Sequence, residues 1–149
     1  MTTHTPAPEG SRFQCTRNKG FHIVFDNGFC VSVQFGPSNY AGNRNLDHDQ
    51  WQTYVTRYDA QSGTDKSRVA FFDVPASKTA EVAVMTEEGD WAQLGPYDEV
   101  AGYCSVSEVM TILVLAQAAK DLSTFHQAYY AAFPDRRPVP RKTKESGDE

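Results

Sequence analysis

The sequence predicts an α+β domain in which an antiparallel sheet built from hairpins is followed by one or two C-terminal helices. Three observations predict it: alternating apolar residues around an Asn-Gly turn, a second such pattern around a glycine turn, and an apolar run preceded by a serine cap. Strand patterns come first and helical patterns last, which is typical of α+β domains. With 149 residues, the chain is long enough for one domain without disulfides.

The first hairpin is expected within residues 20–35. Large apolar residues alternate with smaller or polar ones in both halves, so each half has one apolar face. Asp26-Asn27-Gly28 separates the halves, and an Asn-Gly pair supplies the positive φ angles of a tight turn. The remaining polar residues share the other face, where they can meet solvent or a ligand: His22, Cys30, Ser32 and Gln34.

Further strands are expected in the middle of the chain. Residues 51–58 (WQTYVTRY) are rich in β-formers, although a short helix also fits them, and residues 68–74 (RVAFFDV) stop at a proline. Residues 79–85 and 91–94 flank the turn Glu87-Glu88-Gly89-Asp90. They therefore predict a second hairpin with glycine in its turn.

Two helices are expected at the end. Ser105 and Glu108 have the spacing of a capping box, and the run VMTILVLAQAA that follows is apolar on nearly every side. This helix should be largely buried, against the sheet or in a subunit interface. Its surplus apolar surface predicts a homo-oligomer, with a symmetric dimer the commonest form. The second helix covers residues 122–133 and ends at Pro134.

The termini differ from the body in composition. Residues 1–12 read as a flexible arm, residues 13–133 as a single α+β domain, and residues 134–149 as a disordered tail of mixed charge. The tail is either a solvated end or a weak electrostatic contact for nucleic acid or an acidic partner.

Composition excludes several classes of protein. The net charge of −5 argues against general nucleic-acid binding and against a membrane-surface protein. No apolar run approaches the length of a membrane span, and the N-terminus lacks the apolar core of a signal peptide. The three cysteines form no CxxC pair or disulfide framework, so a reducing cytoplasm is the expected setting.

No catalytic motif stands out. The cluster Asp47-His48-Asp49 could hold a metal only in an irregular loop, and a solvated loop is the simpler interpretation. There is no nucleophile elbow, Walker loop or dinucleotide fingerprint, and Cys30 reads as a small packing residue. We therefore expect no enzymatic activity, no cofactor and no metal.

Residues 36–45 (GPSNYAGNRN) carry groups suited to binding. Glycine permits close backbone approach, asparagine offers donors and an acceptor, tyrosine offers a stacking face and arginine can grip a phosphate. An ordinary turn after a strand would explain the same composition. If the loop is a site, it suits a nucleotide-like ligand, and six residues are the candidates: Asn39, Tyr40, Asn43, Arg44, Arg57 and Arg68.

Three stretches carry a resemblance to a known group of proteins. FDNGFCVSVQFGPSNY, AEVAVMTEEGDW and the serine-capped helix after GYCSVSEV resemble small proteins of tailed bacteriophages with an FxNGxxVSxQFGxxNY pattern. Within that group the plan is similar to the Thoeris anti-defence one sponges. The resemblance covers roughly residues 20–117. Ala41 stands where many such phage proteins have cysteine, and no ligand residue of the family is carried over.

The resemblance implies a phage protein acting in the host cytoplasm. Such sponges are α+β oligomers that sequester cyclic nucleotide or cyclic ADP-ribose-type immune signals without cleaving them. The alternative hypothesis is a phage protein that binds and inhibits a host protein, using an acidic surface and exposed aromatic residues such as Trp51 and Tyr54.

Overall fold

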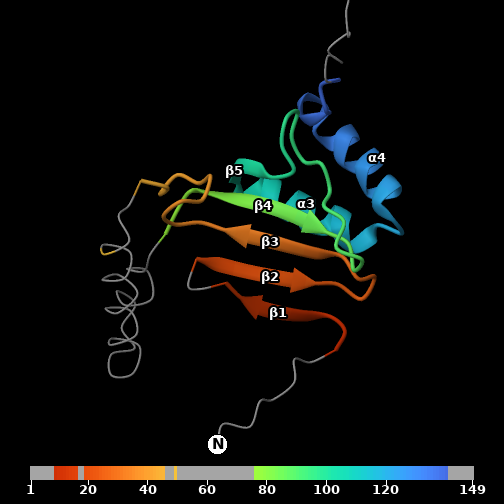
Figure 1. The fold of residues 1–149 in the computed structure, drawn as a ribbon, viewed down its shortest axis with the longest axis horizontal. Helices are drawn as coiled ribbons and strands as arrows, with labels where there is room; N and C mark the ends of the chain where they lie inside the picture. The colour runs from red at the N-terminus through yellow and green to blue at the C-terminus, as the bar shows by residue number, and fades with distance from the viewer. Residues whose placement is uncertain (1–8, 17–18, 46–48, 50–75, 141–149) are drawn as a thin grey trace, which may run out of the picture.

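The computed structural model describes residues 9–16, 19–45, 49 and 76–140. Within them, a five-stranded antiparallel sheet is followed by two α-helices and a short 3-10 helix, which confirms the predicted α+β class (Figure 1). The sheet order follows the chain, β1-β2-β3-β4-β5. The elements are β1 (Arg12–Cys15), β2 (Gly20–Val24), β3 (Cys30–Gln34), β4 (Thr79–Met85), β5 (Ala101–Ser105), α3 (Val106–Ala118), α4 (Leu122–Ala132) and η1 (Pro134–Arg136).

The first hairpin, β2 and β3, is confirmed. Its apolar residues pair across the strands, Phe21 with Val33, and its polar residues pair on the other face, His22 with Ser32. The turn differs in one respect from the sequence prediction. Only Gly28 has a positive φ, 89°, because the loop has three residues and needs a single left-handed position rather than two.

The second hairpin is confirmed at its turn and wrong in its second strand. Gly89 has φ 90°, and the Thr86 amide donates to the Asp90 carbonyl at 2.8 Å. The chain then makes only one bridge to β4, from Trp91. The Ala92 amide still donates to the Val84 carbonyl of β4 at 2.8 Å, but at Gln93 and Leu94 the backbone bonds to α4, where the Tyr129 hydroxyl donates to the Leu94 carbonyl at 2.6 Å.

Both edge strands of the sheet are absent from the sequence prediction. β5 takes the place beside β4 that residues 91–94 were expected to hold. β1 pairs with β2 on the other edge, and it begins at Arg12, the last residue of the expected flexible arm. β1 (RFQC) alternates polar and apolar residues over only four positions, and β5 (AGYCS) has no regular alternation, so neither segment gives a strong strand signal.

The two helices begin where the sequence places them. At the start of α3, the Glu108 amide donates to Ser105 Oγ at 3.2 Å and the Ser105 amide donates to Glu108 Oε1 at 2.9 Å, which confirms the capping box. α4 ends at Ala132, next to Pro134. Beyond the boundary expected at 133, η1 continues the described structure, and the Val139 amide bonds the Pro96 carbonyl at 3.1 Å.

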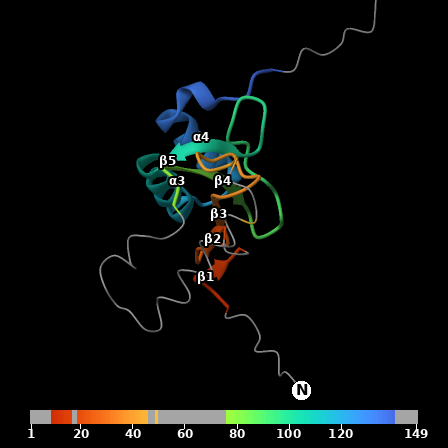
Figure 2. The ribbon, with the colours of Figure 1, turned by 90° about the vertical axis from the view of Figure 1, so that its left-hand side faces the viewer.

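One face of α3 forms the core with the sheet. Val109, Ile112 and Ala116 are buried and pack with the apolar face of β3 and β4 and with Phe125 and Tyr129 of α4. The expectation of a largely buried helix is wrong within a single chain. The opposite side of α3 is exposed, as Val106, Met110 and Val114 show. On its core side α3 contacts β3, β4 and β5 but, among the described strands, neither β1 nor β2 (Figure 2).

Neither described helix has the combination of length and apolar character needed to cross a lipid bilayer.

Candidate ligand-binding surface

The loop of residues 36–45 is anchored to the sheet at three points. The Gly42 amide donates to Thr79 Oγ1 at 2.8 Å and the Tyr40 amide donates to Glu81 Oε2 at 3.0 Å, both on β4. From β5, the Tyr103 amide donates to the Tyr40 carbonyl at 2.7 Å. The loop, orange in Figure 1, is therefore fixed against the end of the sheet where β3 ends and β4 begins.

Bonds within the loop fold it back on itself. The Arg44 amide donates to the Ala41 carbonyl at 3.0 Å, and the Ser38 amide donates to the Arg44 carbonyl at 3.3 Å. Ala41 is buried, with 1% of its surface exposed, and thus holds the middle of the loop in place. Tyr40 and Arg44 flank it and both face solvent.

These bonds bring a cation and two aromatic rings together. The guanidinium carbon of Arg44 lies 4.5 Å from the centre of the Tyr40 ring. The rings of Tyr40 and Tyr103 have centres 6.5 Å apart, at an angle of 46°. Tyr40 is 39% and Tyr103 52% exposed. Among the residues that the structure describes, Arg44 forms no ion pair with a carboxylate. A guanidinium is suited both to stacking on a ring and to holding an anion.

Tyr103 is held beside Tyr40 by an unusual backbone. Its φ of 54° is left-handed, which a tyrosine adopts only when the surroundings impose it. The preceding Gly102 leaves no room for a side chain, since a Cβ there would lie 2.9 Å from the Cβ of Tyr40. Strained backbone is common at ligand sites, where it fixes the position of a contact residue.

Two asparagines of the loop retain unused hydrogen-bonding groups. Asn39 is 9% exposed, and its Nδ2 has no partner among the residues that the structure describes. Asn43 donates weakly to the Ala76 carbonyl at 3.4 Å, while its buried Oδ1 likewise has no partner within the described ranges. A buried polar group without a partner costs about 1 to 3 kcal/mol. The loop thus keeps a donor and an acceptor that a ligand or water can satisfy.

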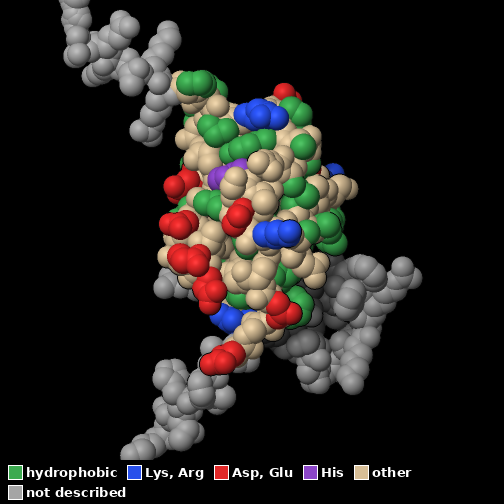
Figure 3. Space-filling model, turned by 90° about the vertical axis from the view of Figure 1, so that its right-hand side faces the viewer, with side chains coloured by type: hydrophobic (Ala, Val, Ile, Leu, Met, Phe, Trp, Pro, Cys, Tyr) green, Lys and Arg blue, Asp and Glu red, His purple; other side chains and the backbone are tan. Residues whose placement is uncertain are grey.

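The charge around the loop is mixed. Lys19 Nζ donates to the Pro37 carbonyl at 3.2 Å and adds a second cation near Arg44, whereas Glu81 places a carboxylate behind Tyr40. The opposite end of the sheet carries the two glycine turns. Acidic side chains gather there (Figure 3), and the turns supply Asp26, Glu87, Glu88 and Asp90. An anion is therefore drawn to the loop end rather than the turn end.

The structure brings together four of the predicted site residues, Asn39, Tyr40, Asn43 and Arg44. Arg57 and Arg68 lie outside the described residues, as do Asp47 and His48 of the possible metal cluster and Trp51 and Tyr54 of the alternative hypothesis. In the part of the chain that the structure describes, no group of metal-ligating side chains forms a site.

Sequence reasoning missed Tyr103, Lys19 and Glu81. Each reaches the loop from a different strand or turn, so their proximity depends on the sheet topology. The small residue at Gly102, directly before Tyr103, is the only local signal of a close approach.

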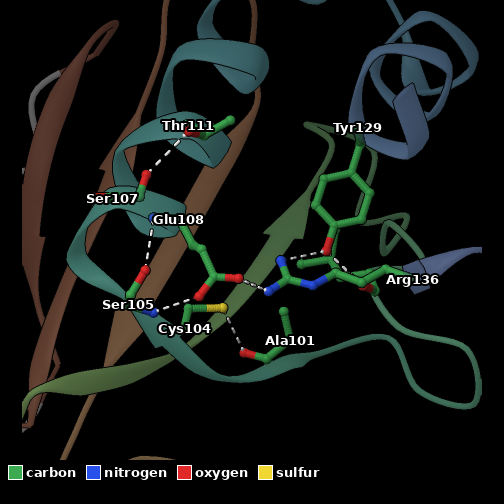
Figure 4. A network of polar contacts seen from close by, with 9 residues as sticks. Ala101, Cys104, Ser105, Ser107, Glu108, Thr111, Tyr129 and Arg136 are labelled. Carbon is green, nitrogen blue, oxygen red and sulfur yellow. Dashed lines mark hydrogen bonds and ion pairs between the residues drawn. The ribbon is translucent and has the colours of Figure 1, made fainter. Parts of the chain in front are cut away.

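A second polar cluster lies between α3 and η1 (Figure 4). Arg136 forms an ion pair with Glu108 and donates to the Tyr129 hydroxyl at 3.2 Å. Burial raises the pKa of Cys104 to about 11 and that of Tyr129 to about 12. Both groups therefore stay protonated at neutral pH. Through Arg136, the cluster connects the start of α3 and the side chain of Tyr129 to η1.

The sheet face opposite α3 has a cavity of about 350 Å³. Its lining includes Arg12, Gln14, His22 and Cys30, so the polar face expected of the first hairpin does meet open space. Burial raises the pKa of Cys30 and lowers that of His22. The lining also contains the carboxylates of Asp26 and Glu87 beside the single cation Arg12, so this cavity is a weaker anion site than the loop.

No family model, curated protein or solved structure matches the chain.

Proposed function

We propose that the protein binds an anionic small molecule with an aromatic ring, of the nucleotide type, on the surface formed by Tyr40, Arg44 and Tyr103. The observation that carries the proposal is the Arg44 guanidinium 4.5 Å from the centre of the Tyr40 ring, with Tyr103 adjacent. A guanidinium can hold a phosphate through two parallel hydrogen bonds, and a tyrosine ring can stack on a base.

The asparagines give the proposed site its specificity. Nδ2 of Asn39 is a donor and Oδ1 of Asn43 is an acceptor, neither with a partner among the described residues. Both atoms are buried, so a ligand bonds to them only when the side chains of the loop rearrange on binding. A ligand that satisfies both recovers the cost of burying them unpaired. This supports recognition of a polar heterocycle or sugar rather than of a simple anion such as sulfate.

The wider role that we propose is sequestration without chemical conversion. The resemblance to phage anti-defence sponges suggests cyclic nucleotide or cyclic ADP-ribose-type immune signals as ligands, captured in the host cytoplasm by a homo-oligomer. Binding alone is enough for this role, so it needs no catalytic group, cofactor or metal.

A thermal-shift screen tests the proposal. The full chain is heated with cyclic mononucleotides, cyclic dinucleotides, ADP-ribose isomers and sulfate. A ligand present at a hundred times its dissociation constant stabilises the folded state by about 2.7 kcal/mol, which raises the melting temperature by several degrees. A shift with one ring-bearing anion, but not with sulfate, is expected. No shift with any compound at millimolar concentration would contradict nucleotide binding.

The alternative function, inhibition of a host protein, has its own supporting observation. Tyr97 is 84% and Val139 47% exposed, and both line a cavity of about 740 Å³. Large exposed apolar residues beside a hollow are typical of protein interfaces. If no nucleotide binds and the parent chain inhibits a host protein, a Tyr97→Ala variant that no longer inhibits that protein would favour this function.

A further inference from the structure

The side of the sheet that α3 occupies is only partly covered. α3 contacts β3, β4 and β5, which leaves β1 and β2 without a described helix on that side (Figure 2). Phe13 of β1 lies opposite Ile23, and Ile23 lies opposite Val31, whose side chain is in the core. Phe13 and Ile23 therefore point to the same side as α3. Phe13 is 80% exposed.

We refer to the uncovered residues on this side of β1 and β2 as the shelf. Facing residues alternate along each strand, so Phe13, Cys15, Phe21 and Ile23 share this side. Phe21 packs against the core, and the shelf consists of Phe13, Cys15 and Ile23. None of them is charged, whereas Arg12, Gln14 and His22 point to the other face. β1 is also an edge strand, with one row of backbone groups outside the ladder.

A stripe on α3 has the same character. Val106, Met110 and Val114 are four residues apart, so they lie along one side of the helix. They are 71%, 55% and 59% exposed. Glu108 is the only charged residue of α3, and its carboxylate is paired with Arg136. The stripe is thus an apolar, uncharged surface of about two helical turns, exposed within the single chain.

We propose that the stripe and the shelf bind the same two surfaces of a second copy and form a symmetric homodimer. Two strands are about 10 Å wide, which matches the width of one helix. The shelf can therefore seat the α3 helix of the partner while its own α3 covers the partner's shelf. In a two-fold symmetric dimer, the stripe of each copy contacts the shelf of the other, so both contacts are identical.

Self-complementarity favours a second copy as the occupant, because every chain carries both the stripe and the shelf and two copies bury all of these surfaces at once. Each chain has a net charge of −5, so two copies repel each other wherever charged faces meet. The stripe and the shelf are uncharged on both sides of the proposed contact, and their pairing avoids that repulsion. Residues 141–149 of the chain, RKTKESGDE, are mostly charged and unsuited to an apolar seat. The proposal is independent of ligand binding.

The test is the mass of the full chain in solution. Light scattering after gel filtration, at 1 to 200 µM protein, should give twice the chain mass of 16.6 kDa. Val114→Glu tests the stripe and Phe13→Glu tests the shelf. Both positions are exposed, so the fold should survive, and circular dichroism checks it. Each variant should raise the dissociation constant of the dimer at least about tenfold. Tyr97→Glu, on an exposed aromatic outside both surfaces, is the matched control and should remain dimeric.

Three results would overturn the proposal. The first is a monomeric parent chain at 200 µM, which would mean that the stripe serves another partner or another segment. The second is a dimer that both glutamate variants leave intact. The third is a dimer that Val114→Glu dissociates and Phe13→Glu does not, since both surfaces belong to the proposed contact.

Discussion

The side-chain nitrogen Nδ2 of Asn27 donates a hydrogen bond to the carbonyl oxygen of Ala116 at 2.8 Å. It also lies 2.8 Å from the Ala119 carbonyl. Asn27 sits in the turn of the first hairpin, and these carbonyls belong to the last turn and the C-cap of α3, where the helix supplies few donors; the Ala119 amide reaches the Ala116 carbonyl only at 3.4 Å. A residue that the sequence marks only as a turn former therefore attaches the hairpin to the helix.

Asn27→Ala should lower the free energy of unfolding by about 1 to 3 kcal/mol, because buried carbonyls lose their donor while the turn can still form at Gly28. Urea unfolding measures this. Asn27→Asp should be at least as destabilising, since a carboxylate cannot donate and its charge opposes the C-terminal end of the helix dipole. Asn45→Ala, on an exposed asparagine, is the control. Equal stability of all three variants would show that the hairpin and helix are joined elsewhere.

Residues 134–140 should contribute to stability, although their composition suggests a disordered tail. A chain that ends at residue 133 loses the Arg136–Glu108 ion pair and the bond from Val139 to Pro96. It should unfold with about 1 to 3 kcal/mol less free energy than the full chain. A chain that ends at residue 140 keeps both contacts and should match the full chain. Indistinguishable melting of the two truncations would refute the role of Arg136.

Acid should destabilise the protein already in the range where histidines titrate. Burial lowers the pKa of His22 and of His126, and the neutral Nε2 of His126 accepts a bond from the Gln93 amide at 3.0 Å. The unfolded chain binds these protons below a pKa of about 6.5, whereas the folded chain resists them. Their contribution is thus complete above pH 6.5 and is lost as pH falls through the lowered values.

Melting temperatures between pH 8 and pH 5 test this dependence. The parent protein should lose stability below pH 6.5, and His126→Gln should show a smaller loss because it removes one of the two groups. The pKa of Glu108 is lowered by its bond to the Ser105 amide, so its contribution is lost only at more acidic pH, below the ordinary range of a carboxyl group. A melting temperature that rises as pH falls from 7 to 5.5 would contradict the claim that neutral His22 and His126 stabilise the folded state.

The features that could be predicted from the sequence are those set by neighbouring residues. The Asn-Gly turn, the Ser105 cap and the stop at Pro134 each depend on a few consecutive positions. The strand predicted at residues 91–94 pairs with β4 only at Trp91 and Ala92, because the carbonyls of Gln93 and Leu94 bond to Tyr130 and Tyr129, more than thirty residues later. No local pattern reports such a partner.

The candidate site shows the same division. Four of the site residues could be selected because they lie within six positions of one loop: Asn39, Tyr40, Asn43 and Arg44. Tyr103 could not, since its place beside Tyr40 follows from β5 pairing with β4 and from a left-handed backbone angle. That angle is imposed by the fold and is not a preference of tyrosine.

The central claim is that Arg44 holds the anionic part of a nucleotide-like ligand, and calorimetric titration of two matched arginine variants tests it most directly. Arg137 is a suitable control because it is also exposed and lies 5.9 Å from the ring centre of Tyr130, away from the loop. With the ligand found by the thermal-shift screen, Arg44→Ala should weaken binding about 10- to 100-fold, the loss expected for a charged hydrogen bond. Arg137→Ala should bind as the parent chain does. Equal affinity of Arg44→Ala and the parent chain would contradict the claim.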